Sequence, residues 1–166
     1  LQDEPLCNVR GSQVKCFGKQ DGIPLSDVFA VLADGGGGLW LGGSNSLVHW
    51  RGRRVLEAYP VEAPVSSLAR TPGGTLWVGL VEGGPGRGLL ALRDGVLKTF
   101  VSEHLDGGEL GVTSLMVDRD GSLWVATDAI GVLRLQAGAV ERYRQPDGLS
   151  GDSVWALFED REGIVW

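Results

Sequence analysis

Residues 112–124 read VTSLMVDRDGSLW, and residues 154–166 read VWALFEDREGIVW. Both stretches open on a valine and close on a tryptophan twelve residues later, within a Gly-x-aliphatic-Trp phrase. Residues 28–40 and 65–77 have the same form. The four tryptophans are 37, 47 and 42 residues apart, whereas the interval from valine to tryptophan is constant. A constant core with variable spacers indicates one supersecondary unit that is repeated, with its length variation in loops.

The sequence pattern of each unit predicts four short strands. The valine opens an apolar run rich in β-branched or aromatic residues, which is typical of a buried strand. A turn and the tryptophan strand follow, and two further strands complete the unit. In the second unit these are 89–93 and 96–100, joined by Asp94-Gly95, a strong hairpin signal. Four antiparallel strands at a mean period of 42 residues predict an all-β fold, a β-propeller of four-stranded blades.

The two ends of the chain complement each other. Residues 7–28 align without gaps onto residues 133–154, at an offset of 126 positions. We therefore expect a single propeller segment over residues 1–166, with three complete blades and two complementary half-blades. The blades are 20–60, 61–103 and 104–146, the outer half-blade is 1–19 and the inner half-blade is 147–166.

Open propeller ends need a partner, because one blade cannot cover both of its apolar faces. The tryptophans are expected to pack between neighbouring blades, where an indole buries a large area. Three arrangements stay open at this point. The chain is part of a longer propeller, or its halves join into a composite fourth blade, or several copies close a larger ring.

Cys7 and Cys16 lie on the two arms of a hairpin centred on Gly11-Ser12. Counting outward from the turn places them opposite each other in a non-hydrogen-bonded pair, with Cα atoms about 4.5 Å apart. That spacing suits a disulfide and an oxidising compartment. Two free buried thiols are the alternative. Since no second Cys or His pair has ligand spacing, no metal or cofactor is expected.

The composition excludes several classes of protein. Hydrophobic residues make up 43% of the chain and include six tryptophans, enough for a core. No apolar run approaches the roughly 18 residues that cross a bilayer. The net charge is −6 and the basic stretch Arg51 to Arg54 is short, so a nucleic-acid partner is not expected. The chain does not begin with methionine and shows no signal-peptide pattern, as expected for an internal or processed piece.

Residues 112–128 (VTSLMVDRDGSLWVATD) and 147–166 (DGLSGDSVWALFEDREGIVW) resemble the two-component regulator propeller repeat. That repeat reads Leu-Ser before the valine and Glu-Asp-x-x-Gly-x-Leu-Trp at the turn. The first two units depart from it, with Ala33-Asp34 and Arg70-Thr71 in place of Glu-Asp. The resemblance implies a periplasmic sensor propeller of a bacterial phosphorelay protein. In such proteins a transmembrane helix and a cytoplasmic histidine kinase or diguanylate cyclase follow, and some respond to oligosaccharides.

We accordingly expect an extracytoplasmic sensor segment that binds a small-molecule or oligosaccharide ligand and carries no catalytic residues. Its partners would be the remaining blades of a parent protein or other copies of the chain. A protein-interaction or self-associating propeller and a propeller lyase are the alternatives, although no paired acid and base groups are visible. The long loops 81–88 and 101–111 are expected on one face, because loops on a rigid scaffold carry binding residues. The candidate ligand-binding residues are Glu82, Arg87, His104, Glu109, Asp128 and the possible aromatic platform Trp155.

Overall fold

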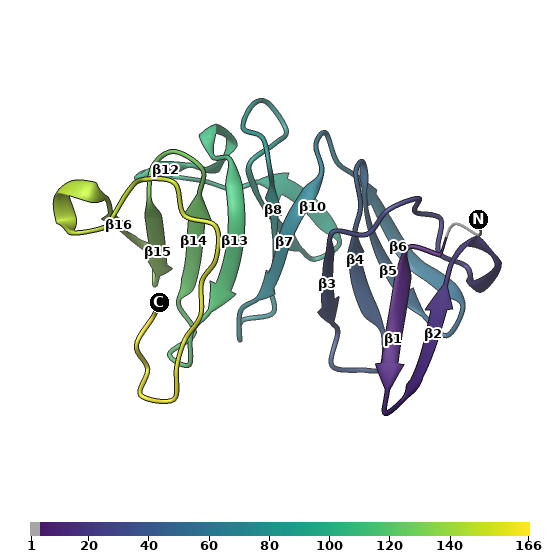
Figure 1. Ribbon diagram of the computed structural model, residues 1–166. Coiled ribbons are helices and arrows are strands. Elements are labelled where there is room, and N and C mark those ends of the chain that lie inside the picture. The colour runs from purple at the N-terminus through teal and green to yellow at the C-terminus, as the bar shows by residue number, and fades with distance from the viewer. Residues whose placement is uncertain (1–3) are drawn as a thin grey trace. The chain divides into compact units, whose positions relative to one another are not determined.

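The computed structural model describes residues 4–166, so residues 1–3 of the expected half-blade 1–19 lie outside the described part. The chain divides into two compact units, one ending at Val65 and the other beginning at Ser66. Figure 1 shows the strands of both units. Almost every element is a strand, and the only helices among the described residues are three short 3₁₀ turns.

The first unit contains a hairpin and one four-stranded antiparallel sheet. The hairpin strands pair directly, and the sheet has the order β3-β4-β5-β6. A small core of Ile23, Leu25, Leu41 and Val48 lies beneath the sheet. Its elements are β1 (Leu6–Arg10), β2 (Gln13–Phe17), η1 (Lys19–Asp21), β3 (Ala30–Ala33), β4 (Leu39–Gly42), β5 (Ser46–Arg51) and β6 (Arg54–Pro60).

The second unit contains two four-stranded antiparallel sheets, with the orders β7-β8-β9-β10 and β13-β14-β15-β16. The first sheet is β7 (Val65–Arg70), β8 (Leu76–Leu80), β9 (Leu89–Arg93) and β10 (Val96–Thr99). The second is β13 (Val112–Val117), β14 (Leu123–Thr127), β15 (Val132–Gln136) and β16 (Ala139–Tyr143). The smaller elements are β11 (Val101–Ser102), β12 (Leu105–Asp106), η2 (Gly107–Glu109) and η3 (Gln145–Asp147).

Four-stranded antiparallel sheets in succession are propeller blades, so the predicted fold class is confirmed as a partial all-β propeller. Two local predictions were wrong. The segment 101–111 is not a plain loop, because β11 pairs with β12 and η2 follows. Residues 154–158 form no regular strand. Phe158 exchanges both backbone hydrogen bonds with Trp166, and within residues 4–166 no strand pairs with residues 154–157.

Within the second unit, neighbouring blades contact through small residues and hydroxyl groups. Ser66 donates its hydroxyl to the carbonyl of Val112 at 2.6 Å, and Ser67 accepts from the backbone N–H of Leu115 at 2.9 Å. Gly79 lies against Val112 so closely that a β-carbon would clash. A small residue is therefore required where β8 meets the next blade.

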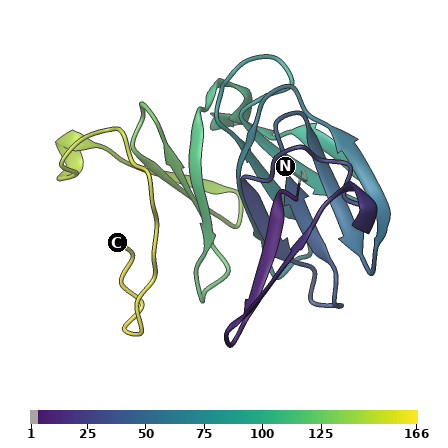
Figure 2. The same ribbon diagram turned by 45° about the vertical axis from the view of Figure 1, so that its right-hand side comes forward.

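The C-terminal segment docks onto β13 and β14 in a related way. Thr113 donates its hydroxyl to the carbonyl of Val154, and the Val154 N–H donates to Thr127 at 2.9 Å. Figure 2 shows this segment running beside the second sheet of its unit. Residues 154–166 thus occupy the position of the inner part of a following blade.

An aspartate closes the turn between the first two strands of three repeats. Asp118 accepts from the backbone N–H groups of Asp120 and Ser122 and, at 2.8 Å, from the Trp124 indole. Asp160 does the same with Glu162, Ile164 and Trp166. One carboxylate therefore ties the turn to the tryptophan that defines the repeat.

Asp34 accepts from two backbone N–H groups of its turn in the same way, and its second oxygen contacts His49 and Arg51. The fourth turn residue of each repeat is a glycine with positive φ: Gly37 at 91°, Gly74 at 87°, Gly121 at 82° and Gly163 at 86°. Only glycine adopts this conformation at little cost, which explains why the turn carries it in every repeat.

Tryptophan burial decreases along the second unit. Trp77 is 5% exposed, Trp124 is half-buried and Trp166 is 71% exposed. A following sheet packs against Trp77, whereas only the C-terminal hairpin lies beyond Trp124. The expectation that each tryptophan packs between blades is therefore confirmed where a following blade is present.

The predicted disulfide is confirmed. Cys7 pairs with Cys16 across β1 and β2 and is bonded to it, with Cα atoms 4.0 Å apart. The pairing of β1 with β2 also repeats that of β15 with β16 position by position, at the offset of 126 residues. The 3₁₀ turns η1 and η3 follow the two hairpins at equivalent positions.

Thr71 stands where the other repeats have aspartate, and the Trp77 indole N–H is buried without a partner among the described residues. We predict that Thr71→Asp stabilises the chain by about 1 kcal/mol, because it supplies the missing acceptor. Equilibrium denaturant unfolding measures this. Thr71→Val is the control and should give no gain. An unchanged or lower stability for Thr71→Asp would contradict the role given to the turn aspartate.

We predict that acid destabilises the fold by protonating the turn aspartates Asp118 and Asp160. Burial raises the pKa of Asp118, but hydrogen bonds from Trp124 and Ser122 and the charge of Arg134 outweigh it, so the pKa lies below 3.8. The hydrogen bond to Trp166 likewise lowers the pKa of Asp160. Because both folded-state pKa values lie below those of the unfolded chain, their stabilisation is complete above pH about 4 and is lost as pH falls further. Unfolding measured at several pH values should show this loss, and Asp118→Asn should reduce it.

Loss of the disulfide should destabilise the first unit. The bridge closes a short loop, and removal of such a constraint costs about 2–3 kcal/mol. We expect Cys7→Ser with Cys16→Ser to lower the unfolding midpoint of the oxidised protein, and reductant to have the same effect on the unaltered chain. If the two forms unfold at the same midpoint, the bridge does not stabilise this hairpin.

Candidate functional site

The two long loops pack together at one end of the second unit, near the upper edge of that unit in Figure 1. The Gly84 N–H donates to the carbonyl of Gly108 at 2.6 Å, and Gly83 lies against Glu109. Gly88 contacts the backbone of Gly107, where a β-carbon would clash. The glycines of the first loop therefore let two backbones meet, which brings the loop residues of one blade beside the connector to the next.

A pocket of about 490 Å³ lies between this connector and the outer strand of the next blade. His104 and Glu109 line it from the connector, and Arg142 and Arg144 line it from β16 and the residue after it. Ser102, Glu103 and Asp106 complete its polar lining, and Leu105, Leu110 and Ile130 form the apolar part. A mixed polar lining of this kind, with both signs of charge, suits a hydroxyl-rich or charged small molecule.

Two polar atoms in this lining are buried without compensation. The Nε of Arg144 and the hydroxyl of Ser102 have no hydrogen-bond partner among residues 4–166. Buried polar groups are normally paired, so each of these two lining residues carries a hydrogen-bonding group that is unused in this structure. The Arg142 guanidinium donates a hydrogen bond to the carbonyl of His104 at 3.0 Å, and this bond connects β16 to the connector.

The six residues expected to bind ligand occupy different environments. His104 and Glu109 line the same pocket, as described above. Glu82 and Arg87 instead form an ion pair with each other at 2.7 Å, which closes their loop. Asp128 is exposed at the β14–β15 turn, where its N–H donates to Gly111. Trp155 is 73% exposed and lies in none of the described pockets.

Sequence reasoning missed the arginines of this pocket and Ser102. Arg142 and Arg144 belong to the outer strand of a blade, which the repeat pattern marks as scaffold. The burial pattern of β16 offers no clear signal, since Glu141 and Arg142 are both exposed beside the half-buried Tyr143. His104 and Arg142 are 38 residues apart in the sequence, so no local pattern indicated their contact.

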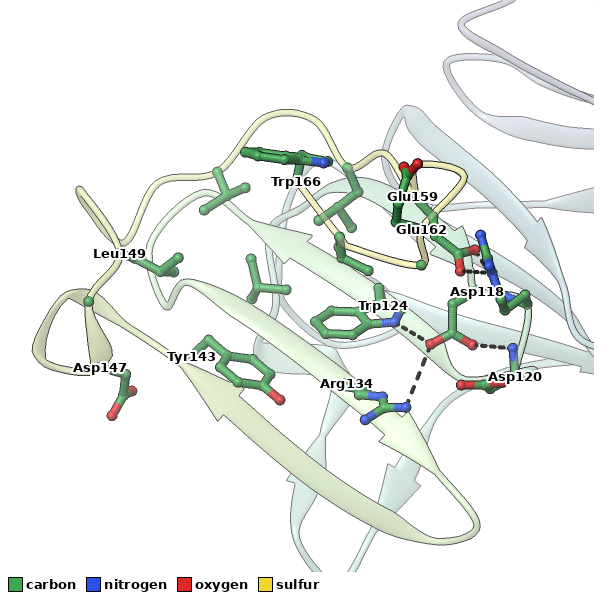
Figure 3. A pocket seen from close by; sticks show the side chains of 17 residues that line it. Asp118, Asp120, Trp124, Arg134, Tyr143, Asp147, Leu149, Glu159, Glu162 and Trp166 are labelled. Atoms are coloured by element: carbon green, nitrogen blue, oxygen red, sulfur yellow. Dashed lines mark hydrogen bonds and ion pairs between the residues drawn. The ribbon is translucent and has the colours of Figure 1, made fainter.

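A second and larger concavity, of about 650 Å³, lies between β14–β16 and the C-terminal hairpin (Figure 3). We call it the Trp124 groove. Tyr143 stacks on the Trp124 ring at 5.7 Å, and the Arg134 guanidinium lies 5.4 Å from the same ring. Arg119 bridges to Glu159 of the hairpin at 2.6 Å. Its walls are thus the aromatic face of one blade and the inner part of the next.

The comparisons with known proteins agree with this architecture. Residues 107–129 and 148–166 match the family model of the two component regulator propeller. These two segments are similar to two component regulator propeller repeats. The matched segments contain the two valine-to-tryptophan stretches whose sequences agree best with the family repeat. The match does not extend to the first two repeats. No curated protein sequence matches the chain.

Solved structures show the same fold. The extracellular domain of a protein assigned as a hybrid two component system of B. thetaiotaomicron matches with a TM-score of 0.67 and 23% identity, over 84% of this chain and 19% of that one. A streptogramin B lyase matches at 0.72 and 18%, over 96% and 53%. Virginiamycin B lyase from Staphylococcus aureus matches at 0.71 and 15%, over 96% and 54%. The chain thus spans about a fifth of the sensor domain and about half of the lyases.

Two findings bear on the cellular location of the chain. Solved extracellular domains share its fold, and it contains a disulfide, which is typical of an oxidising compartment. Over residues 4–166 no helix has the length and apolar character that a membrane span needs. The disulfide and the fold shared with extracellular domains are consistent with an extracytoplasmic location.

Proposed function

We propose that this chain is the ligand-sensing part of a periplasmic propeller in a bacterial transmembrane signalling protein, and that it acts by binding. The polar pocket of His104, Glu109, Arg142 and Arg144 carries the proposal, together with the two component regulator propeller repeats that surround it. A histidine kinase or diguanylate cyclase that reads the bound state belongs to other parts of such a protein.

The lining favours a ligand rich in hydroxyl or carboxylate groups, of which an oligosaccharide with acidic sugars is the class we propose. Arginine side chains bind carboxylates in a planar, two-point geometry, and the neighbouring Glu109 accepts from hydroxyl groups. The pocket joins the connector after one blade to the outer strand of the next. Ligand bound there would bridge both and stiffen their contact, and a rigid sheet pair would pass that change along the propeller.

Binding without chemistry is supported by the two histidines of the chain. His49 is hydrogen-bonded to Asp34 at 2.9 Å and stacks on Trp40 at 4.3 Å, so it serves the turn of its own blade. His104 and Ser102 line the same pocket, but the Ser102 hydroxyl has no hydrogen-bond partner among residues 4–166, so the two form no activated pair in this structure. The likeness to the lyases, at 18% identity or less, concerns the fold.

Isothermal titration with a panel of neutral and acidic oligosaccharides tests the proposal. We expect binding by the unaltered chain and a loss of at least about tenfold in affinity for Arg144→Ala and for His104→Ala, since each removes a charged or polar contact worth about 1.5–3 kcal/mol. Arg54→Ala, which changes an exposed arginine of the first unit, is the matched control and should bind normally.

Two results would contradict the proposal. One is binding that all three variants retain unchanged, which would place the ligand elsewhere. The other is cleavage or elimination of a bound sugar, detected by mass spectrometry of the ligand, which would make the chain a lyase. Circular dichroism of each variant confirms that a loss of binding is not a loss of folding.

A further inference from the structure

The connector 101–111 lies between two pockets of the second unit. One is the polar pocket between the connector and β16, which we call the arginine pocket after Arg142 and Arg144. The other, which we call the glycine pocket, has a volume of about 470 Å³. Both volumes lie in the range of about 300–1,000 Å³ that is typical of small-molecule sites. The glycine pocket is lined by Gly84 and Gly86 of the loop 81–88, by Thr99 of β10, and by Asp106, Gly108 and Glu109 of the connector.

The two pockets share a wall. Asp106 and Glu109 line both of them. Both side chains are exposed, whereas Leu105, Gly107 and Leu110 beside them in the chain are buried. The wall is therefore anchored in the core of the unit, and it presents two carboxylates to solvent. An extended molecule can pass from one pocket to the other across these two residues.

The loop 81–88 of the glycine pocket is held in place by its own contacts. The Gly84 N–H donates to the carbonyl of Gly108 at 2.6 Å, and the Gly88 N–H donates to the carbonyl of Glu82 at 3.1 Å. The ion pair of Glu82 with Arg87 closes the loop. A fixed loop loses little conformational freedom when a molecule binds. Because its glycines carry no side chain, a bound molecule can approach the loop backbone closely.

The two pockets differ in charge. Arg142 and Arg144 line the arginine pocket, and neither guanidinium forms an ion pair within residues 4–166. No lysine or arginine of the described residues lines the glycine pocket. At the shared wall, Asp106 accepts from the Gly108 N–H at 2.9 Å with one carboxylate oxygen. The Glu109 carboxylate takes part in no hydrogen bond or ion pair of residues 4–166.

These charges suit different parts of one ligand. An arginine binds a carboxylate in a two-point geometry, so an acidic unit fits the arginine pocket. Ionised carboxylates only accept hydrogen bonds, so the shared wall suits hydroxyl groups, which can donate. A second acidic unit at the wall would meet like charges at short distance and be repelled.

We propose that the bound molecule is an extended oligosaccharide whose acidic unit lies in the arginine pocket. Its next unit is neutral, crosses Asp106 and Glu109, and lies in the glycine pocket. This ligand class rests on the proposed function and is narrower than it, since an acidic unit followed by a neutral one binds better than a chain of acidic units. The two carboxylates of the shared wall are the groups that determine this specificity.

Isothermal titration with three matched sugars tests the proposal. The sugars are glucuronic acid, glucuronic acid joined to glucose, and two glucuronic acids joined by the same linkage. We expect the mixed disaccharide to bind at least about tenfold more tightly than glucuronic acid, because its neutral unit adds hydrogen bonds to charged acceptors. The diacid should bind no more tightly than glucuronic acid, although it differs from the mixed disaccharide only by its second carboxylate.

A charge-neutral wall should remove this preference. Asp106→Asn with Glu109→Gln keeps the shape of both side chains, and asparagine also caps a helix start, so η2 should be retained. The affinity for the diacid should rise at least about tenfold in this double variant and approach that for the mixed disaccharide. Glu62→Gln, which removes an exposed carboxylate of the first unit, is the control and should keep the preference of the unaltered chain. Circular dichroism checks the folding of each variant.

The possible failures are distinguishable. If glucuronic acid binds through Arg144 but neither disaccharide binds more tightly, the extension into the glycine pocket is wrong and the proposed function stands. If both disaccharides bind equally well, or if the double variant keeps their ratio, the role of the shared wall is wrong. If none of the three sugars binds, the proposal is overturned, and binding of the wider oligosaccharide panel decides whether the proposed function falls with it.

Discussion

A propeller blade has two apolar faces, and this protein is organised by the need to cover each of them with a neighbour. The tryptophan in the second strand of each blade lies on one of those faces. In the second unit its exposure follows the amount of protein beyond it, from the buried Trp77 through the half-buried Trp124 to the exposed Trp166. The close contacts of Ser66 and Gly79 with the next blade show the same requirement in the backbone, since only small or hydroxyl-bearing residues permit that approach.

In two repeats a turn aspartate binds the tryptophan of its own blade, Asp118 with Trp124 and Asp160 with Trp166. The turn aspartate accepts hydrogen bonds from two backbone groups and from the indole, so the ring is oriented within its own blade. The second blade lacks this aspartate and leaves the Trp77 indole N–H without a partner among the described residues, although its ring is well covered. Orientation by the turn and burial by the neighbour are thus separate contributions, and a repeat can lose one and keep the other.

Two long loops of the second unit contribute to the candidate binding pocket. Their glycines let the loop 81–88 and the connector 101–111 touch, and the connector then forms a pocket with the outer strand of the next blade. Ligand contacts at such a place depend on how two blades meet. Under the proposed function, a bound molecule would act through these blade contacts.

The sequence by itself determined the repeat, the strands, the turn chemistry and the pairing of Cys7 with Cys16. These depend on spacing of 2 to 12 residues and on the residue types that strands and turns require, which are local properties. The offset of 126 residues also carried the register of β1 with β2, because one repeat is a template for another. The sequence also predicted His104 and Glu109 as candidate binding residues of one connector, and in the structure both line one pocket.

Only the tertiary structure decided the rest. It added Arg142 and Arg144 to the pocket and used Glu82 and Arg87 to close a loop. It also left residues 154–158 without regular strand structure, beside a short hairpin closed by Phe158 and Trp166. Each outcome depends on a partner that is distant in the chain or on a strand that this chain does not pair. A repeat pattern specifies which face of a blade is apolar, but which segment covers that face is decided by packing between elements far apart in sequence.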